Sequence, residues 1–188
     1  EIPLRLVGSE MCIRDRCGID VSSITDYKDL TDVYATVKEK YPDMVMMASN
    51  NSATPDTKYE MNDTLTDGFG VLMDHGQDTT VVDYYETDEY KEFVETMYDW
   101  QQKGYLSKDA ATTTESAENQ VKAGAAFSYL APNKPGYDTR AALLCGTEME
   151  IAPISEPWAG TAQISYLTYG ISSSSADKDK TMQCLDYL

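Results

Sequence analysis

The residues of this chain best suited to hold a ligand are side-chain amides, carboxylates and aromatic rings that follow expected strands. Ligands of open α/β sheets meet the loops at the carboxyl ends of the strands. Pockets for small molecules are mostly apolar with a few placed polar groups, and side chains of these types supply both. The candidate ligand-binding residues are Asn50, Tyr129, Asn133, Glu156, Trp158 and Tyr166.

Trp158 is the strongest of these candidates. It lies in the proline-containing loop Pro153–Gly160, outside any periodic apolar pattern, so core packing explains it less well. The alternative is a lid over a local hydrophobic cluster, which the sequence favours about equally. Tyr166 and Tyr169 fall on opposite faces of an expected strand, so one of the two is expected to face a ligand.

A catalytic alternative rests on four carboxylates, Asp83, Glu86, Asp88 and Glu89. They could form a cation site or a pair of catalytic carboxylates. Their spacing lacks the alternating pattern of a calcium loop, and we favour a solvated helix N-terminus, where the helix dipole stabilises anions. His75 is the single histidine and no nucleophile motif accompanies it, so we expect no histidine-based catalytic centre, no metal and no cofactor.

The charge of the chain restricts its partners. The net charge is −17, with 32 acidic and 15 basic residues, which argues against nucleic acid and against an anionic membrane surface. A hydrophobic content of 41% and fourteen tyrosines indicate a folded domain rather than an acidic tail. Cys145 and Cys184 are far apart in the sequence and are interpreted as small buried thiols.

Helices are expected to alternate with short apolar strands, which is typical of an α/β layered domain. Thr25 is the expected N-cap of the first helix and Thr87 that of the longest one. Residues 49–67 are polar and are expected to form a long loop. The expected helices span 24–41, 87–104, 116–123, 137–144 and 176–188, and the expected strands span 44–48, 68–73, 80–84, 125–130, 148–154 and 163–172.

Residues 1–16 stand apart from the rest. Leu6–Asp15 is what one reading frame of a transposase adapter for sequencing libraries encodes, which predicts a metagenomic read translated through its adapter. Such segments are excluded before fold reasoning, so we predict that residues 1–16 contribute nothing to the core. The alternative is a native, basic amphipathic N-terminus.

Three stretches, in their order and spacing, resemble extracellular solute-binding proteins of family 1, which serve ABC importers. Gln120–Tyr129 resembles the family's turn from a helix through glycine into an apolar strand. Tyr169–Lys178 with Met182–Leu188 resembles the Tyr-Gly-Ile-Ser segment and the helix that follows it, and Phe93–Leu106 is similar to the helix that precedes the first motif. Cys17 and Cys184 depart from the pattern, since aromatic residues are usual at both positions.

The resemblance implies one lobe of a two-lobe, type II periplasmic-binding-protein-like fold of class α/β, truncated at both ends. Residues 17–170 would form the C-terminal lobe, and residues 171–188 would begin the return towards the other lobe. The implied protein is a monomeric, extracellular lipoprotein of the Gram-positive type. It would capture an oligosaccharide or a uronate-containing sugar and pass it to permease subunits, and it would not be an enzyme. The alternatives are a sugar-acting hydrolase that uses residues 83–89 and an acidic surface interaction module.

Overall fold

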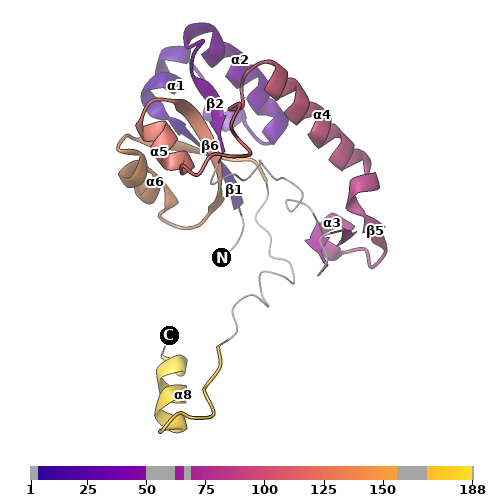
Figure 1. Cartoon of the computed structure of the whole chain (residues 1–188), viewed down its shortest axis with the longest axis vertical. Coiled ribbons are helices and arrows are strands. Elements are labelled where there is room, and N and C mark those ends of the chain that lie inside the picture. Colours follow the sequence, from indigo (N-terminus) through magenta and orange to yellow (C-terminus); the bar gives the residue numbers. More distant parts are fainter. Residues whose placement is uncertain (1–3, 50–61, 66–68, 156–168, 188) are drawn as a thin grey trace.

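The structure is a computed structural model of the 188-residue chain, and it describes residues 4–49, 62–65, 69–155 and 169–187. Its main body is a four-stranded sheet with helices on both faces (Figure 1). The class is α/β, as expected. The strands are β1 (Leu4–Glu10), β2 (Val45–Ala48), β6 (Ala126–Asn133) and β7 (Met149–Pro153).

The order of the strands in this sheet is β2-β6-β1-β7. β2 runs parallel to β6, and β1 runs antiparallel to both β6 and β7. It follows that β2, β6 and β7 all point the same way and end at one edge of the sheet. We call this edge the carboxyl edge.

The expectation that residues 1–16 contribute nothing to the core is wrong for this structure. β1 lies between β6 and β7, with Leu4 opposite Asn133 and Glu10 opposite Met149. Ile13, in the following helix α1 (Met11–Cys17), is 8% exposed and belongs to the main hydrophobic cluster. The physical reason is that an extended segment satisfies its backbone groups on both sides when it inserts between two strands. Whether the segment derives from an adapter stays a prediction.

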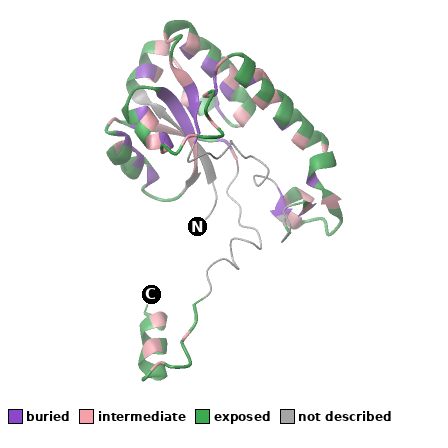
Figure 2. Cartoon of the chain, in the orientation of Figure 1, coloured by how far each residue is buried: buried purple, intermediate pink, exposed green. Residues whose placement is uncertain are grey.

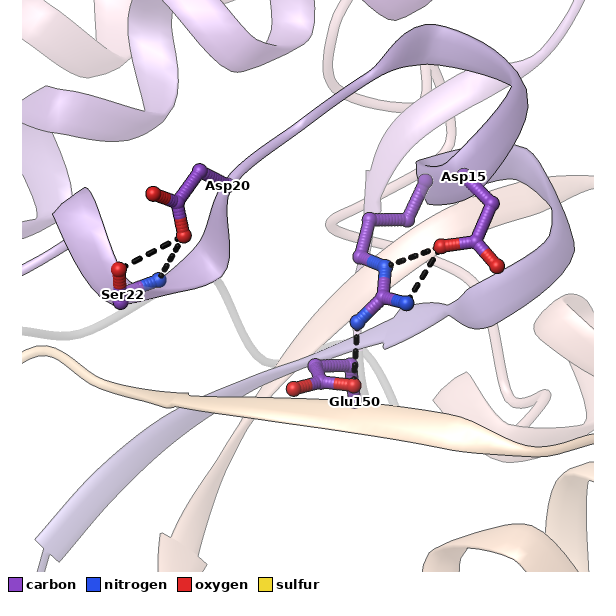
Figure 3. Close-up of polar contacts among 5 residues, drawn as sticks. Asp15, Asp20, Ser22 and Glu150 are labelled. Atoms are coloured by element: carbon purple, nitrogen blue, oxygen red, sulfur yellow. Dashed lines mark hydrogen bonds and ion pairs between the residues drawn. The ribbon is translucent and has the colours of Figure 1, made fainter.

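Polar contacts also tie the segment to the sheet. The Arg14 guanidinium donates hydrogen bonds to the carboxylates of both Asp15 and Glu150, the latter on β7 (Figure 3).

Asp20 accepts hydrogen bonds from the backbone and the hydroxyl of Ser22, and these bonds lower the pKa of the Asp20 carboxyl. Asp20 thereby caps the short 3-10 helix η1 (Val21–Ser23).

The first long helix begins later than expected, because its cap is Asp26 rather than Thr25. The Asp26 carboxylate accepts from the backbone of Lys28, and the Asp29 carboxylate accepts from the backbone of Asp26, which closes a capping box. This cap begins the 3-10 helix η2 (Tyr27–Asp29), which continues directly into α2 (Leu30–Lys40).

The longest helix, α4 (Asp88–Gln102), is capped by Thr87 as expected, since its hydroxyl accepts a hydrogen bond from the backbone of Tyr90 at 3.2 Å. Phe93 and Trp100 on α4 are buried. The Trp100 ring lies edge-on to Tyr34 of α2, and its Nε1 donates to the Thr31 hydroxyl at 2.9 Å. Trp100 therefore packs α4 against α2.

Two hydrophobic clusters form the core. The first joins α1, α2 and α4 to β2 and β6, and the second joins β6 to α5 (Ala117–Lys122) and α6 (Tyr137–Cys145). Buried positions concentrate on β2 and β6 (Figure 2). One polar network lies inside the core, where the Ser128 hydroxyl contacts the Tyr34 hydroxyl at 2.9 Å and donates to the Met46 carbonyl at 2.7 Å.

A second, smaller sheet has the strand order β3-β4-β5 and is all antiparallel. The chain reaches it after β2 and returns to the main sheet through α4, so it projects from the body at the far end of that helix (Figure 1). Within the segment assigned to α3, Asp74 and His75 have positive φ angles of 50° and 54°. The elements are β3 (Asp63–Thr64), β4 (Gly70–Leu72), α3 (Met73–Gly76), β5 (Val81–Asp83) and the 3-10 helix η3 (Tyr84–Glu86).

The last described helix, α8 (Lys178–Asp186), stands away from the body (Figure 1). Its position in the sequence is as expected, but none of its described residues is buried, and Met182 is exposed. Across the described residues, no helix is both long enough and apolar enough to cross a membrane.

Candidate functional site

The carboxyl edge of the main sheet is the candidate ligand site of the described structure. Ser49 follows β2 directly, Asn133 is the last residue of β6, and Ser155 lies two residues beyond β7. Because the three strands are parallel to one another, these residues lie at the same edge. Ligands of open α/β sheets bind in this location.

The hydroxyl oxygens of Ser49 and Ser155 are buried and have no hydrogen-bond partner among the described residues. The Ser49 backbone, by contrast, is fixed, since its carbonyl accepts a hydrogen bond from the Gln120 side chain of α5 at 2.9 Å. A buried hydroxyl without a partner is unfavourable by about 1–3 kcal/mol, so the two serines are groups that a polar ligand could satisfy.

The six expected ligand-binding residues differ in whether and where the structure places them. Asn133 lies at the carboxyl edge, as its position after an expected strand required. Asn50, Glu156, Trp158 and Tyr166 lie outside the described residues, and their roles stay predictions. The chain leaves the carboxyl edge towards these residues at Ser49 and at Ser155.

Tyr129 is placed in the core rather than on a ligand-facing surface. Its side chain is 2% exposed and belongs to the second hydrophobic cluster. Its hydroxyl receives a hydrogen bond from the Tyr137 hydroxyl at 3.4 Å and lies 4.0 Å from the Cys145 sulfur. Sequence reasoning did not foresee this because β6 is covered on both faces, so a side chain on either face of it can be buried. The structure gives no support to a sugar contact from Tyr129.

The groups around Tyr129 have no acid–base role at neutral pH. Burial raises the pKa of the Tyr129 hydroxyl well above its usual range, and burial also raises the pKa values of Tyr137 and Cys145. All three are therefore protonated and neutral near pH 7. An uncharged, buried thiol is a poor nucleophile, so Cys145 acts in packing, as expected. The same expectation is wrong for Cys184, which is exposed on α8 because that helix stands away from the body.

The acidic cluster of residues 83–89 has the structural arrangement of a helix N-terminus. Asp83 accepts a hydrogen bond from the backbone of Tyr85 at 3.0 Å and caps η3. Asp88 and Glu89 occupy the first turn of α4. Within the described ranges, no group of three or more His, Cys, Asp or Glu side chains is arranged to hold a metal ion.

An aromatic cluster at the junction of the small sheet and α4 was missed by sequence reasoning. It consists of Phe69, Tyr84, Tyr85 and Tyr90, whose rings meet edge-to-face in four pairs. The ring centroids are 5.5 Å apart for Phe69 and Tyr85 and 4.8 Å apart for Tyr85 and Tyr90. The available signal in the sequence was the Tyr84-Tyr85 pair followed by Tyr90.

The fold and the carboxyl edge define the class of protein. The described body is one lobe of the fold of periplasmic solute-binding proteins, in which ligands are captured rather than converted. No protein-family model matches the chain. A carbohydrate ABC transporter substrate-binding protein of Streptococcus pneumoniae serotype 4 is 27% identical over 172 residues, which cover 91% of this chain and 35% of that protein.

Solved structures agree with this class. The N-glycan transport solute-binding protein NgtS of Streptococcus pneumoniae is similar over 100% of this chain and 41% of its own, with 25% identity and a TM-score of 0.83. Its complex with Man1GlcNAc gives a TM-score of 0.78, 26% identity and coverage of 100% and 42%. The GacH receptor of Streptomyces glaucescens, at 15% identity and a TM-score of 0.51, shows the fold alone over 86% of this chain and 39% of its own.

The comparisons confirm the resemblance stated from the sequence. The relatives are substrate-binding proteins of carbohydrate transporters, and such proteins are not enzymes. The chain spans about a third to two fifths of the length of the relatives it matches. This share agrees with a single lobe of a two-lobe fold.

Proposed function

We propose that this chain is part of a protein that captures an extracellular carbohydrate and delivers it to the permease subunits of an ABC importer. The observation that carries the proposal is the combined likeness in sequence and fold to carbohydrate-binding relatives over nearly the whole chain. The carboxyl edge supports it, since it holds two buried serine hydroxyls that have no hydrogen-bond partner among the described residues.

The proposed ligand is an oligosaccharide, and the charge favours a neutral one. The chain carries a net charge of −17, which repels anionic ligands at long range. A uronate-containing sugar would need a cation in the site to offset this repulsion. A neutral sugar needs only hydroxyl partners and flat apolar faces.

The mechanism proposed is capture between two lobes with closure at a hinge, and this chain supplies one of the lobes. The remaining proposals are that the complete protein is a monomer, lies outside the cell and is anchored as a lipoprotein. Residues 17–170 are proposed to be the lobe, and residues 171–188 the return segment, which includes α8.

The hydrolase alternative has no structural support. Two of the four carboxylates in residues 83–89 occupy the first turn of α4, and Asp83 caps η3. A hydrolase would release product from chromogenic glycosides, whereas a binding protein would release none. This assay separates the two functions without requiring knowledge of the natural ligand.

Calorimetry tests the binding function directly. We expect the 188-residue chain to bind neutral oligosaccharides far more weakly than a two-lobe protein that contains it, because a cleft between lobes shares its contacts. Man5GlcNAc and Man1GlcNAc are suitable neutral probes, and trigalacturonate is the anionic probe. Equal affinity in the chain and in the two-lobe protein would show that one lobe holds the whole site. Absence of binding by the two-lobe protein to all three probes would refute the proposal.

Ser49→Ala tests the carboxyl edge. Its hydroxyl has no partner among the described residues, so we expect the unfolding midpoint to stay the same or rise, while affinity for the sugar falls by about 0.5–1.5 kcal/mol. The matched control is Ser22→Ala on η1, which removes a hydroxyl hydrogen-bonded to Asp20 and should leave sugar affinity unchanged. A Ser49→Ala variant that binds with full affinity would show that this serine does not contact the ligand.

A further inference from the structure

A further chain segment reaches the carboxyl edge beside β2. Met47 of β2 forms an isolated parallel bridge with Leu106, which follows α4 in the chain. Because this bridge is parallel, the chain beyond Leu106 leaves the sheet at the same edge as Ser49, which directly follows β2. Residues 107–115 therefore begin at the carboxyl edge, next to Ser49, and lead into α5.

The helix α5 is fixed against the sheet by its apolar side chains. Ala117 and Val121 are four residues apart, and both are buried in the second hydrophobic cluster together with Ala48 of β2. Ser116 is the N-cap of the helix. Residues three or four apart share a face of a helix, so Gln120, three residues after Ala117, lies beside the buried face and close to the end of β2.

The side chain of Gln120 connects the two chain segments. Its Nε2 donates to the Ser49 carbonyl at 2.9 Å and to the Glu115 carbonyl at 3.4 Å. Helical side chains lean towards the N-terminus of their helix, and the N-terminus of α5 is the end that follows residues 107–115. A side-chain amide carries two N–H donors, so one glutamine can hold two carbonyls. We call this pair of hydrogen bonds the amide bridge.

The amide bridge holds a residue that the strand pairing does not hold. The register between β2 and β6 ends at the pair Ala48–Tyr129, so Ser49 lies just beyond it. The Ser49 hydroxyl is buried and has no hydrogen-bond partner among the described residues, whereas the Ser49 carbonyl is bound by Gln120. The backbone that carries this hydroxyl is therefore placed before a ligand arrives, and a ligand that bonds it loses little free energy to ordering the site.

We infer that Gln120 is a positioning residue of the candidate sugar site, and that it acts through Ser49 rather than on the sugar. The inference rests on the proposed function and adds residues 107–115 to the border of the carboxyl edge. Both partners of the Gln120 amide are carbonyl oxygens, which only accept hydrogen bonds. The property that matters at position 120 is therefore the ability to donate, and shape alone is not enough.

The amide bridge can be observed without sugar. In NMR spectra of the 15N-labelled 188-residue chain, we expect the side-chain amide protons of Gln120 to exchange with water more slowly than those of Gln101, which is exposed on α4. The Gln120 signals are assigned by their loss in the Gln120→Lys variant. Equal exchange rates for the two glutamines would overturn the inference, whatever the sugar does.

Three substitutions separate donation from shape. Gln120→Ala removes the group, Gln120→Glu keeps the shape but presents a carboxylate without a donor, and Gln120→Lys restores donors on a slightly longer side chain. In NMR titrations of the folded variants with Man1GlcNAc, we expect Gln120→Ala and Gln120→Glu to weaken binding by about three- to tenfold, the effect of a lost hydrogen bond. Gln120→Lys should stay within about twofold of the unchanged chain. The matched control is Asn119→Ala, which truncates an exposed neighbour on α5 and should leave the affinity unchanged.

A double-mutant cycle tests whether Gln120 acts through Ser49. Ser49→Ala removes the hydroxyl, so adding Gln120→Ala to it should weaken binding by less than about twofold further. Losses that multiply in the double variant would show that Gln120 acts on the sugar independently of Ser49, which overturns the inference.

The outcomes distinguish this inference from the proposed function. Binding of Man1GlcNAc with the same affinity by the unchanged chain and by Gln120→Glu would overturn the positioning role and leave the proposed function intact. The same holds for a Ser49→Ala variant with full affinity, since Gln120 could not then act through its hydroxyl. An unchanged chain that binds neither Man1GlcNAc nor Man5GlcNAc at millimolar concentration would overturn both.

Discussion

Removal of β1 is the sharpest test of how this lobe is built. The shortened variant begins at Gly18 and therefore lacks β1 and α1. Neighbouring strands in a sheet lie about 4.8 Å apart, so β6 and β7 would be separated by about twice that distance, too far for direct pairing. β1 is the described strand that pairs with β7, so β7 would lose its ladder to the rest of the sheet.

The expected loss follows from the side chains that leave the core. Ile13 is deleted, while Met149 and Ile154 lose the sheet that holds them; the three are 8%, 7% and 4% exposed. Burial of one such side chain contributes about 1.5–3 kcal/mol, so three contribute roughly 5–9 kcal/mol. A whole domain is stable by only about 5–15 kcal/mol, so the shortened chain should be close to unfolding.

Thermal unfolding followed by circular dichroism measures the effect. In a chain of this size, 1 kcal/mol shifts the midpoint by about 2–4 °C, so the loss should exceed about 10 °C or abolish the transition. The control is a chain that ends at Ser175 and lacks α8, none of whose described residues is buried. Its midpoint should match that of the full chain.

An unchanged midpoint in the chain that begins at Gly18 would refute this reasoning. It would show that β1 is not part of the cooperative fold. It would also favour the interpretation that residues 1–16 come from a translated adapter, because a segment that is not native to the protein is not needed for its folding.

Three further predictions concern single side chains. Tyr34→Phe removes the hydroxyl that contacts Ser128 and should lower the free energy of unfolding by about 0.5–1.5 kcal/mol in urea titrations. Burial raises the pKa of the Tyr34 hydroxyl, so the folded state binds the hydroxyl proton more tightly than the unfolded state does. The contribution of Tyr34 to the free energy of unfolding is therefore fully present below the ordinary tyrosine pKa of about 10 and is lost as the pH rises above it. The Tyr34→Phe variant should lose less stability at alkaline pH. Trp100→Ala should lower the free energy of unfolding by about 3–5 kcal/mol, measured in the same titrations, while any folded protein still binds sugar. Trp158→Ala, outside the described residues, should weaken sugar binding in a two-lobe protein by about 1–3 kcal/mol in calorimetry with little change in its unfolding midpoint, and the reverse pattern would place Trp158 in a core.

Local signals in the sequence were sufficient for most helices. Thr87 caps α4, Ser116 caps α5, and α6 ends at Gly146, whose φ of 68° is in the left-handed region that glycine adopts readily. Each of these capping residues lies within one turn of the helix end that it determines, so the helix end can be predicted from one sequence. The first cap was misplaced by one residue, since the Asp26 carboxylate accepts from the backbone of Lys28, whereas the Thr25 hydroxyl donates to the Asp29 carboxylate.

Long-range pairing could not be read in the same way. The partners of β1 lie more than a hundred residues away, and nothing local to residues 4–10 specifies them. The burial of Tyr129 depends on α5 and α6 covering one face of β6, which is also a property of distant segments. The ends of β2 and β7 at the candidate site were predictable from apolar runs. The aromatic cluster was not, because it forms where β4, β5 and α4 fold against one another.

The central place of β1 has a consequence for the order of events in folding. Ser9 pairs with Ser128 and Glu10 with Met149, so the ribosome must add about 120 residues after β1 before its first partner strand exists. At about 5–20 residues per second, β1 waits roughly 6–25 s. Pairings so distant along the chain are slow to form even afterwards, because a long loop must close before any contact is gained. During that interval the backbone groups of β1 are open to strands of neighbouring chains, and aggregation should increase with the rate of expression.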